Sequence, residues 1–181
     1  MIQIRVDNAE RIEQLFENTP REAKIILVRA INRGATAART RSSVLLRKNY
    51  IMKAEDIKKR IKIRKATANN LSAQIRASGP VTPLMKFDVT PSTPQSVIVR
   101  ARVKKGGSRK VIKHGFVNRM SNSHVNVFTR VGRNRLPIKG LYGPSIAQMM
   151  GKEEIVEEII ERGQTVRDER LEHELNRLLR G

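Results

Sequence analysis

The stretch NRLPIKGLYGPSIAQMM, residues 134–150, separates a basic, strand-like middle of the chain from a helical C-terminal part. It places Pro137, Gly140, Gly143 and Pro144 close together, a density that an ordinary helix or strand does not tolerate. It is also richer in large apolar side chains than a solvated linker. The stretch therefore predicts an irregular but ordered segment that buries apolar groups in its own domain or against a partner.

Helical periodicity is present on both sides of this segment. A stripe of Ile, Leu and Ala predicts a long helix from Thr19-Pro20 to about Lys48, with Gly34 as a weak point. Small residues around Gly34 would let another backbone approach closely. A second stripe, with acids early and arginines late, predicts a helix over 152–180 that is kinked or broken at Gly163.

Alternating apolar and polar residues predict the strands. The expected strands are 2–6, a hairpin of 61–64 and 71–77, and a meander of 97–103, 111–117 and 125–131. Two short helices are also expected, one beginning at Asp7 or Asn8 and one over 52–60.

These elements predict an α+β fold, in which a long N-terminal helix packs on an antiparallel sheet of about four or five strands and a C-terminal helix follows. The expected division is an α+β domain over 1–150 and a helical segment over 151–181. Four prolines make 79–95 an expected extended, mobile or partner-held loop.

The positive charge is concentrated in the middle of the chain. The net charge is +20 overall, and residues 101–150 carry eleven Lys or Arg and no carboxylate. Such a field favours a polyanion, usually nucleic acid, although acidic patches on a protein partner remain the main alternative. No apolar run is long enough to span a membrane, so no membrane partner is expected.

Catalytic patterns are lacking in the sequence. There is no Cys, and His114, His124 and His173 have no further ligands at metal spacing, so no metal site is expected. Asp56 and Asp88 are isolated, whereas a nuclease needs clustered acids to hold its cation. No phosphate-loop or nucleophile-elbow pattern is present. We therefore expect neither an enzyme nor a cofactor.

Several blocks of the sequence resemble the prophage minor tail protein Z family. The text RAINRGATAARTRSSVLLRKNYIMKAEDIKKRIKIRKA, at 29–66, is similar to the basic helix, short helix and basic strand near the start of that family. The matching positions are Ala30, Asn32 and Arg33, followed by Lys53, Asp56 and Ile57. The similarity continues through 114–132 and ends in RLPIKGLYGPSIAQMM, its most specific block, and it spans about residues 20–160.

This resemblance implies a virion component of long-tailed phages that is made in the host cytoplasm. Such tail-completion factors form rings, hexameric by expectation, at the head-proximal end of the tail tube. The implied partners are further copies of the chain, the tail terminator, the tube, the neck and the DNA that passes through the ring. A ring around DNA would explain the charge without base-reading motifs, because it acts on phosphates generally.

Two sets of residues follow as site predictions. The DNA-facing candidates are Arg100, Arg102, Lys104, Lys105, Arg109, Lys110 and Lys113. The subunit-contact candidates are Arg135, Pro137, Ile138, Leu141, Tyr142, Pro144 and Ile146. Each cation taken singly could equally be an ordinary solvated surface charge.

Two alternatives stay open at this point. One is a non-specific nucleic-acid-binding module unrelated to virions, although its aromatic residues are too sparse for base stacking unless Phe116 and Phe128 are neighbours on an exposed face. The other is a structural ring whose basic groups meet acidic partner surfaces.

Overall fold

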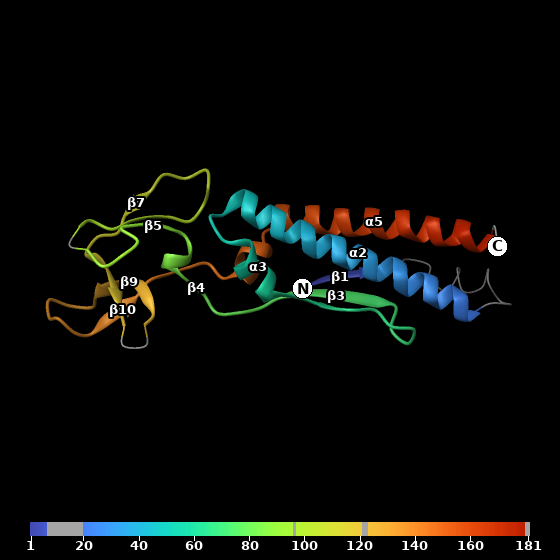
Figure 1. Ribbon diagram of the computed structural model, residues 1–181, viewed down its shortest axis with the longest axis horizontal. Coiled ribbons are helices and arrows are strands. Elements are labelled where there is room, and N and C mark those ends of the chain that lie inside the picture. Colours follow the sequence, from blue (N-terminus) through green and yellow to red (C-terminus); the bar gives the residue numbers. More distant parts are fainter. Residues whose placement is uncertain (7–19, 96, 121–122, 180–181) are drawn as a thin grey trace.

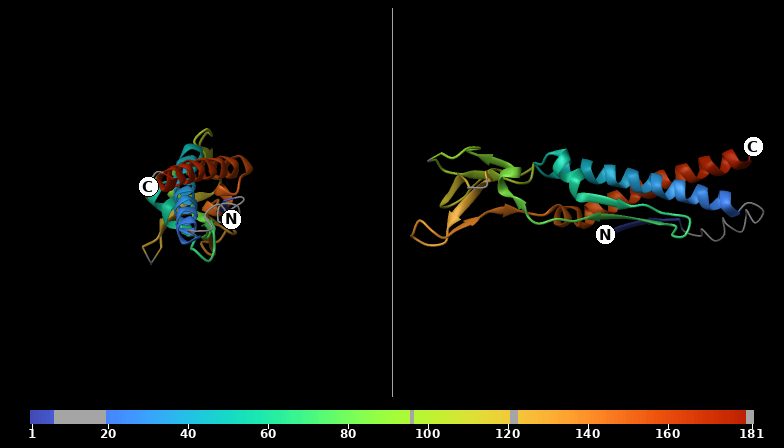
Figure 2. Two further views of the ribbon diagram at one scale, coloured as in Figure 1. Left: turned by 90° about the vertical axis from the view of Figure 1, so that its right-hand side faces the viewer. Right: turned by 60° about the horizontal axis from the view of Figure 1, so that its bottom comes forward.

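Two long helices, α2 (Pro20–Asn49) and α5 (Glu153–Leu179), form one end of an elongated molecule in the computed structural model (Figure 1). The structure describes residues 1–6, 20–95, 97–120 and 123–179. The helix expected to begin at Asp7 or Asn8 lies outside these residues. The two helices run antiparallel and cross each other, as the end-on view in Figure 2 shows.

Two glycines allow the backbones of α2 and α5 to touch where they cross. A Cβ atom on Gly34 would lie 2.5 Å from the carbonyl oxygen of Gly163, and a Cβ atom on Gly163 would lie 2.8 Å from Cδ1 of Ile4. The close approach expected around Gly34 is therefore confirmed. The break expected at Gly163 is wrong, since α5 continues through it. Glycine serves here because its missing side chain lets another helix pack, which compensates for its poor helix propensity.

Ion pairs join α5 to α2 on either side of the crossing. Arg41 bonds Glu158 at 2.5 Å, and Arg29 contacts Glu174 at 3.5 Å. The Glu174 side chain is buried and also contacts Arg170 and Arg177 on its own helix. The acidic C-terminal helix thus neutralises part of the basic helix within the subunit.

A small sheet packs beneath the helix pair. Its order is β1 (Ile2–Arg5), β3 (Ser72–Ala77) and β2 (Ile61–Arg64), all antiparallel. The hairpin of β2 and β3 is confirmed with Ile63 opposite Ile75. Ile2, Ile4 and Ile75 are buried on the side that faces the helices, which explains the alternation in the sequence.

Two polar side chains of α2 hold the β2–β3 hairpin and the short helix α3 (Ala54–Arg60) in place. The Asn32 amide donates to the Ala66 carbonyl at 3.1 Å and accepts from the Ala66 N–H at 2.8 Å. Arg39 donates to the carbonyls of Lys58 and Ile61, at and just beyond the end of α3. Both contacts satisfy backbone groups that would otherwise lack partners.

The other end of the molecule is a strand-rich head, residues 84–140 (Figure 1). It contains two three-stranded antiparallel sheets. One has β5 (Asp88–Thr90), β6 (Arg100–Arg102) and β7 (Lys110–Val111), and the other has β8 (Gly115–Arg119), β9 (Val125–Arg130) and β10 (Ile138–Gly140).

The α+β class is confirmed, but the strands are arranged differently from the expectation. The described strands form four sheets of two or three strands each, where one sheet of four or five was expected. The expected meander divides at a turn before β8, in which His114 adopts a φ of 56° and the Gly115 N–H bonds the Ile112 carbonyl. This turn directs β8 into the second sheet instead of beside β7.

The head joins the helical end through a two-strand neck, β4 (Thr82–Pro83) paired with β11 (Tyr142–Gly143). The stretch 79–95, expected as an extended loop, contains β4, the short helix η1 (Leu84–Lys86) and β5. Buried Asn126 of β9 ties the neck together, because its amide donates to the Leu141 carbonyl and accepts from the N–H of Met85.

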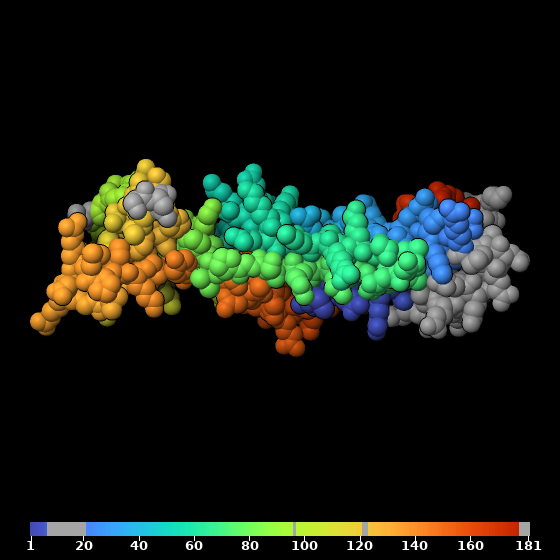
Figure 3. Space-filling view, turned by 90° about the horizontal axis from the view of Figure 1, so that it is seen from below, coloured from blue at the N-terminus to red at the C-terminus, as the bar shows by residue number. Residues whose placement is uncertain are grey.

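The opening stretch of the sequence is ordered, as expected. It forms β10, β11 and α4 (Ile146–Met150), whose start carries a capping box between Ser145 and Gln148. Figure 3 shows the molecule from below. The orange part of the chain that leads into the stretch 134–150 reaches the far end of the head, and the later part of that stretch returns to the helical end.

Candidate nucleic-acid interface and contact surfaces

The head carries nearly unopposed positive charge. Residues 84–140 contain thirteen Lys or Arg and one carboxylate, Asp88. All seven DNA-facing candidates lie in this part of the chain. Arg100 and Arg102 belong to β6 and Lys110 to β7, whereas the other four lie in the connections on either side of β7.

Asp88 engages two of the seven candidates. Its carboxylate accepts from Arg109 at 2.9 and 3.0 Å and from Arg102 at 3.1 Å. The Arg109 guanidinium, with Arg102 as a second donor, holds the pKa of Asp88 below its ordinary value of 3.8. Asp88 is therefore not isolated, and it opposes part of the charge that the sequence shows as unopposed.

Lys104 and Lys105 lie at the junction with the helical end and not at the far tip of the head. Lys104 pairs with Tyr50 in an isolated antiparallel β-bridge, and the backbone N–H of Lys105 donates to the Asn49 carbonyl at 3.0 Å. The β6–β7 loop is thus anchored to the end of α2.

Arg100, Lys110 and Lys113 are the candidates that the structure leaves most open to a phosphate. All three are exposed, and none has an ion-pair partner among the described residues. Five further exposed cations of the head were not among the DNA-facing candidates, although they lie in the same stretch without carboxylates, residues 101–150. These are Arg119, Arg130, Arg133, Arg135 and Lys139.

The two phenylalanines of the second sheet are neighbours, but they do not form a base-stacking platform. Phe116 and Phe128 pair across β8 and β9 with their ring centroids 6.2 Å apart. Phe128 is buried, and Arg130 covers the Phe116 ring at 5.4 Å. Both rings are already occupied, so this sheet offers charge and not stacking to a nucleic acid.

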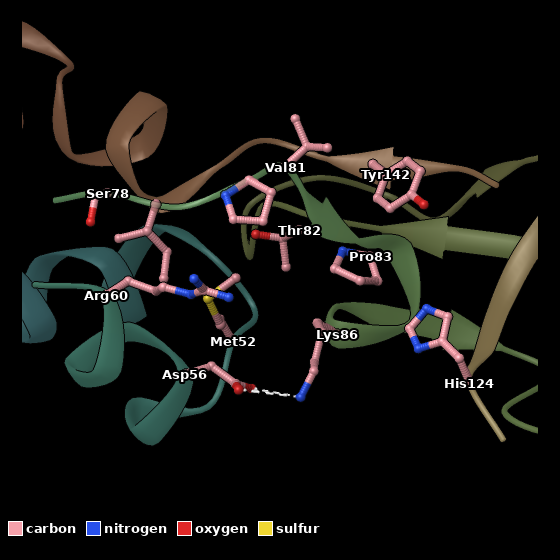
Figure 4. Close-up of a pocket in the computed structure, with 12 residues that line it drawn as sticks. Met52, Asp56, Arg60, Ser78, Val81, Thr82, Pro83, Lys86, His124 and Tyr142 are labelled. Carbon is pink, nitrogen blue, oxygen red and sulfur yellow. Dashed lines mark hydrogen bonds and ion pairs between the residues drawn. The ribbon is translucent and has the colours of Figure 1, made fainter. Parts of the chain in front are cut away.

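A cleft of about 460 Å³ lies at the neck, between α3 and the head (Figure 4). Across its floor, the Lys86 amine donates to Asp56 at 3.2 Å, so this carboxylate also has a partner. Pro83, His124 and Tyr142 line the side of the cleft toward the head. The ion pair connects α3 to η1 directly.

The contact candidates of 134–150 differ in exposure. Arg135, Pro137 and Tyr142 are exposed, and Ile138, Leu141 and Pro144 are half-buried. Ile146 is 5% exposed within its own chain, so it has almost no surface left for a neighbour. It is a core residue of the subunit, and the contact role of the other six stays a prediction.

Within the described ranges, no three His, Asp or Glu side chains come together in a group able to hold a metal ion. In the same part of the chain, no helix has the length and apolar character needed to span a membrane.

Comparisons with known proteins agree with the resemblance seen in the sequence. Residues 7–181 match a family model described as "Prophage minor tail protein Z (GPZ)". The chain is also 27% identical over 149 residues to a protein of Escherichia phage N15 named "Tail completion protein", covering 76% of this chain and 79% of that protein. No solved structure matches the chain significantly.

Proposed function

Because the chain belongs to the prophage minor tail protein Z family, it is a structural component of the phage tail, and we propose that it completes the tail as a ring at the head-proximal end. In this ring the subunits contact the tail terminator, the tube and the neck. The basic heads line the path of the DNA.

The observation that carries this proposal is the separation of charge along the molecule. The head has one carboxylate for thirteen cations, and Asp88 is already shared by Arg102 and Arg109. At the helical end, acids of α5 oppose Arg29 and Arg41 of α2. The uncompensated positive field is therefore strongest on the head.

A field of this kind suits a channel through which DNA of any sequence must pass. Exposed Lys and Arg bind phosphates without reading bases, and their contribution falls steeply with salt. The covered ring of Phe116 and the buried ring of Phe128 leave the β8–β9–β10 sheet without a free ring for base stacking. The role is thus positional and electrostatic.

In this ring, the neck and the tip of the head contact neighbouring tail proteins. Arg135 and Pro137 are exposed in the loop between β9 and β10, and Tyr142 is 54% exposed at the rim of the neck cleft. A half-exposed tyrosine beside a partly apolar cleft is typical of a contact site, since tyrosine combines a large apolar area with a polar tip.

Salt-dependent DNA binding tests the role of the head. Replacing Arg100, Lys110 and Lys113 with Gln should lower the slope of log affinity against log salt by about 3, roughly one per phosphate contact. The matched control replaces the exposed Lys58, Lys59 and Lys62 with Gln, and it should leave the slope nearly unchanged.

If both triple variants lower the slope equally, DNA has no preference for the head, and the head does not have the role proposed for it. Absence of DNA binding, together with retention on an acidic partner protein, would favour the structural ring without DNA contact. Negative-stain imaging of purified tails tests the ring itself, and a single copy per tail would overturn it.

A further inference from the structure

The outer face of α5, which points away from α2, is an acidic stripe. Its members recur at helical spacing of three, four or seven residues and are exposed. They are Glu154, Glu157, Glu161, Asp168 and Glu172. Of the five, only Asp168 has an ion pair within the described part of the chain, with Arg167 of the same helix.

An exposed flank of α2, beside its contact with α5, is a basic and partly apolar stripe with the same spacing. Its exposed members are Arg29, Arg33, Thr36, Thr40, Val44 and Arg47. Several of these residues line a shallow groove of about 310 Å³ together with Ala37 and with Arg162 and Val166 of α5. Arg33 and Arg47 have no ion-pair partner among the described residues, and Val44 is 48% exposed.

The two stripes match in length and in level along the molecule. From Glu154 to Glu172 and from Arg29 to Arg47, each stripe spans roughly 27 Å at 1.5 Å per residue. Because α2 and α5 are antiparallel, the ion pairs Arg41–Glu158 and Arg29–Glu174 together give the levels of residues along both helices to within about one helical turn. The level pairs are Arg47 with Glu154, Thr40 with Glu161, Arg33 with Asp168 and Arg29 with Glu172.

We propose that these faces bind each other between copies, so that the acidic face of α5 in one subunit docks on the basic face of α2 in the next. This contact rests on the proposed ring and names its interface. Two different surfaces of one subunit form a heterologous contact, which is the kind that closes into a ring. Rotation about an axis along the length of the molecule keeps levels unchanged, so Arg29, Arg33 and Arg47 meet Glu172, Asp168 and Glu154. Of these six, Arg29 and Asp168 also have an ion-pair partner in their own subunit.

A second copy fits this face better than another partner because both complementary stripes belong to the same chain. Nucleic acid would suit the basic stripe but would leave the acidic stripe of the same helix pair unopposed. Opposite potentials also fix register and exclude wrong pairings.

Cysteine cross-linking tests the contact directly, since the chain contains no Cys. Thr40→Cys and Glu161→Cys are made in separate full-length chains, which are then mixed and oxidised at high concentration and in assembled tails. The mixture should yield a cross-linked dimer, whereas neither variant should cross-link with itself. Self-cross-linking of Glu161→Cys would overturn the proposal, because it would place α5 against α5.

Charge exchange provides the second test. Arg47→Glu or Glu154→Arg alone should weaken self-association by at least about tenfold, and the two changes combined should restore much of it. Glu55→Lys, an exposed reversal on α3, is the control and should have little effect. Circular dichroism confirms that each variant is folded.

The outcomes separate this contact from the ring as a whole. If tails contain multiple copies but show neither the cross-link nor the charge rescue, the contact is wrong and the ring stands. If tails contain one copy and the purified chain remains a monomer, the ring and the contact both fail.

Discussion

Gly34→Ala probes the crossing of α2 and α5 with a single methyl group. The added Cβ would lie 2.5 Å from the carbonyl oxygen of Gly163 and 2.9 Å from Cβ of Arg167. The oxygen belongs to backbone, so it cannot rotate away as a flexible side chain would. Arg167 is buried and donates to the Arg5 carbonyl, so it is also held in place. The helices must therefore separate to admit the methyl group.

The expected loss follows from two opposing effects. Overpacking costs about 1–3 kcal/mol, and a contact of 2.5 Å with backbone puts this case in the upper part of that range, at about 2–3 kcal/mol. The higher helix propensity of alanine returns about 1 kcal/mol. The free energy of unfolding should therefore fall by roughly 1–2 kcal/mol, which corresponds to a lowering of Tm by about 3–6 °C in a chain of this length.

Denaturant and thermal unfolding of three variants test this reasoning. Gly163→Ala should cost less than Gly34→Ala, because its nearest contact is Cδ1 of Ile4, at the end of a side chain. Gly106→Ala is the control, since no atom lies within 4 Å of its added Cβ, and it should stay within about 0.5 kcal/mol of the parent. If Gly34→Ala instead stabilises the protein by about 1 kcal/mol, only the higher helix propensity of alanine contributes at this position, and the helices do not pack as closely as described.

Two further predictions concern the head and the neck. Asp88→Asn should lower the free energy of unfolding at pH 7 by about 1 kcal/mol while tightening DNA binding. Because the pKa of Asp88 is lowered in the folded state, the stabilisation from its ion pairs is present above pH 3.8 and is lost as the pH falls through the lowered pKa. The stabilities of variant and parent should therefore converge in acid, and a difference that persists there would contradict this role. Tyr142→Ala should change the free energy of unfolding by less than about 1 kcal/mol, because the side chain is 54% exposed, yet it should block tail assembly in a complementation assay; normal yields of complete tails would remove Tyr142 from the contact surface.

Local patterns in the sequence predicted the elements that depend on near neighbours. The apolar period of α2 and the alternation in β2 and β3 both appear in the structure. These features arise from backbone geometry over a few residues, which periodicity reports directly. The blocks that resemble the tail protein family were equally legible.

Contacts between distant parts of the chain were not legible in this way. Asp88 lies 14 and 21 residues from its partners Arg102 and Arg109, and only the pairing of β5 with β6 brings them together. The expected meander was divided by one turn at His114, which sends two similar strand patterns into different sheets. Strand pattern specifies a face but not a partner strand.

By itself, the sequence determined the fold class, the two long helices, the basic middle of the chain and the likeness to its family, since each depends on composition or local order. The tertiary structure alone decided what 134–150 does within the subunit, where it forms one strand of the neck and buries Ile146, and that Gly163 is a contact between helices. It also decided which cations remain unpaired. Those outcomes depend on which distant atoms meet, and packing between elements, not spacing along the chain, fixes that.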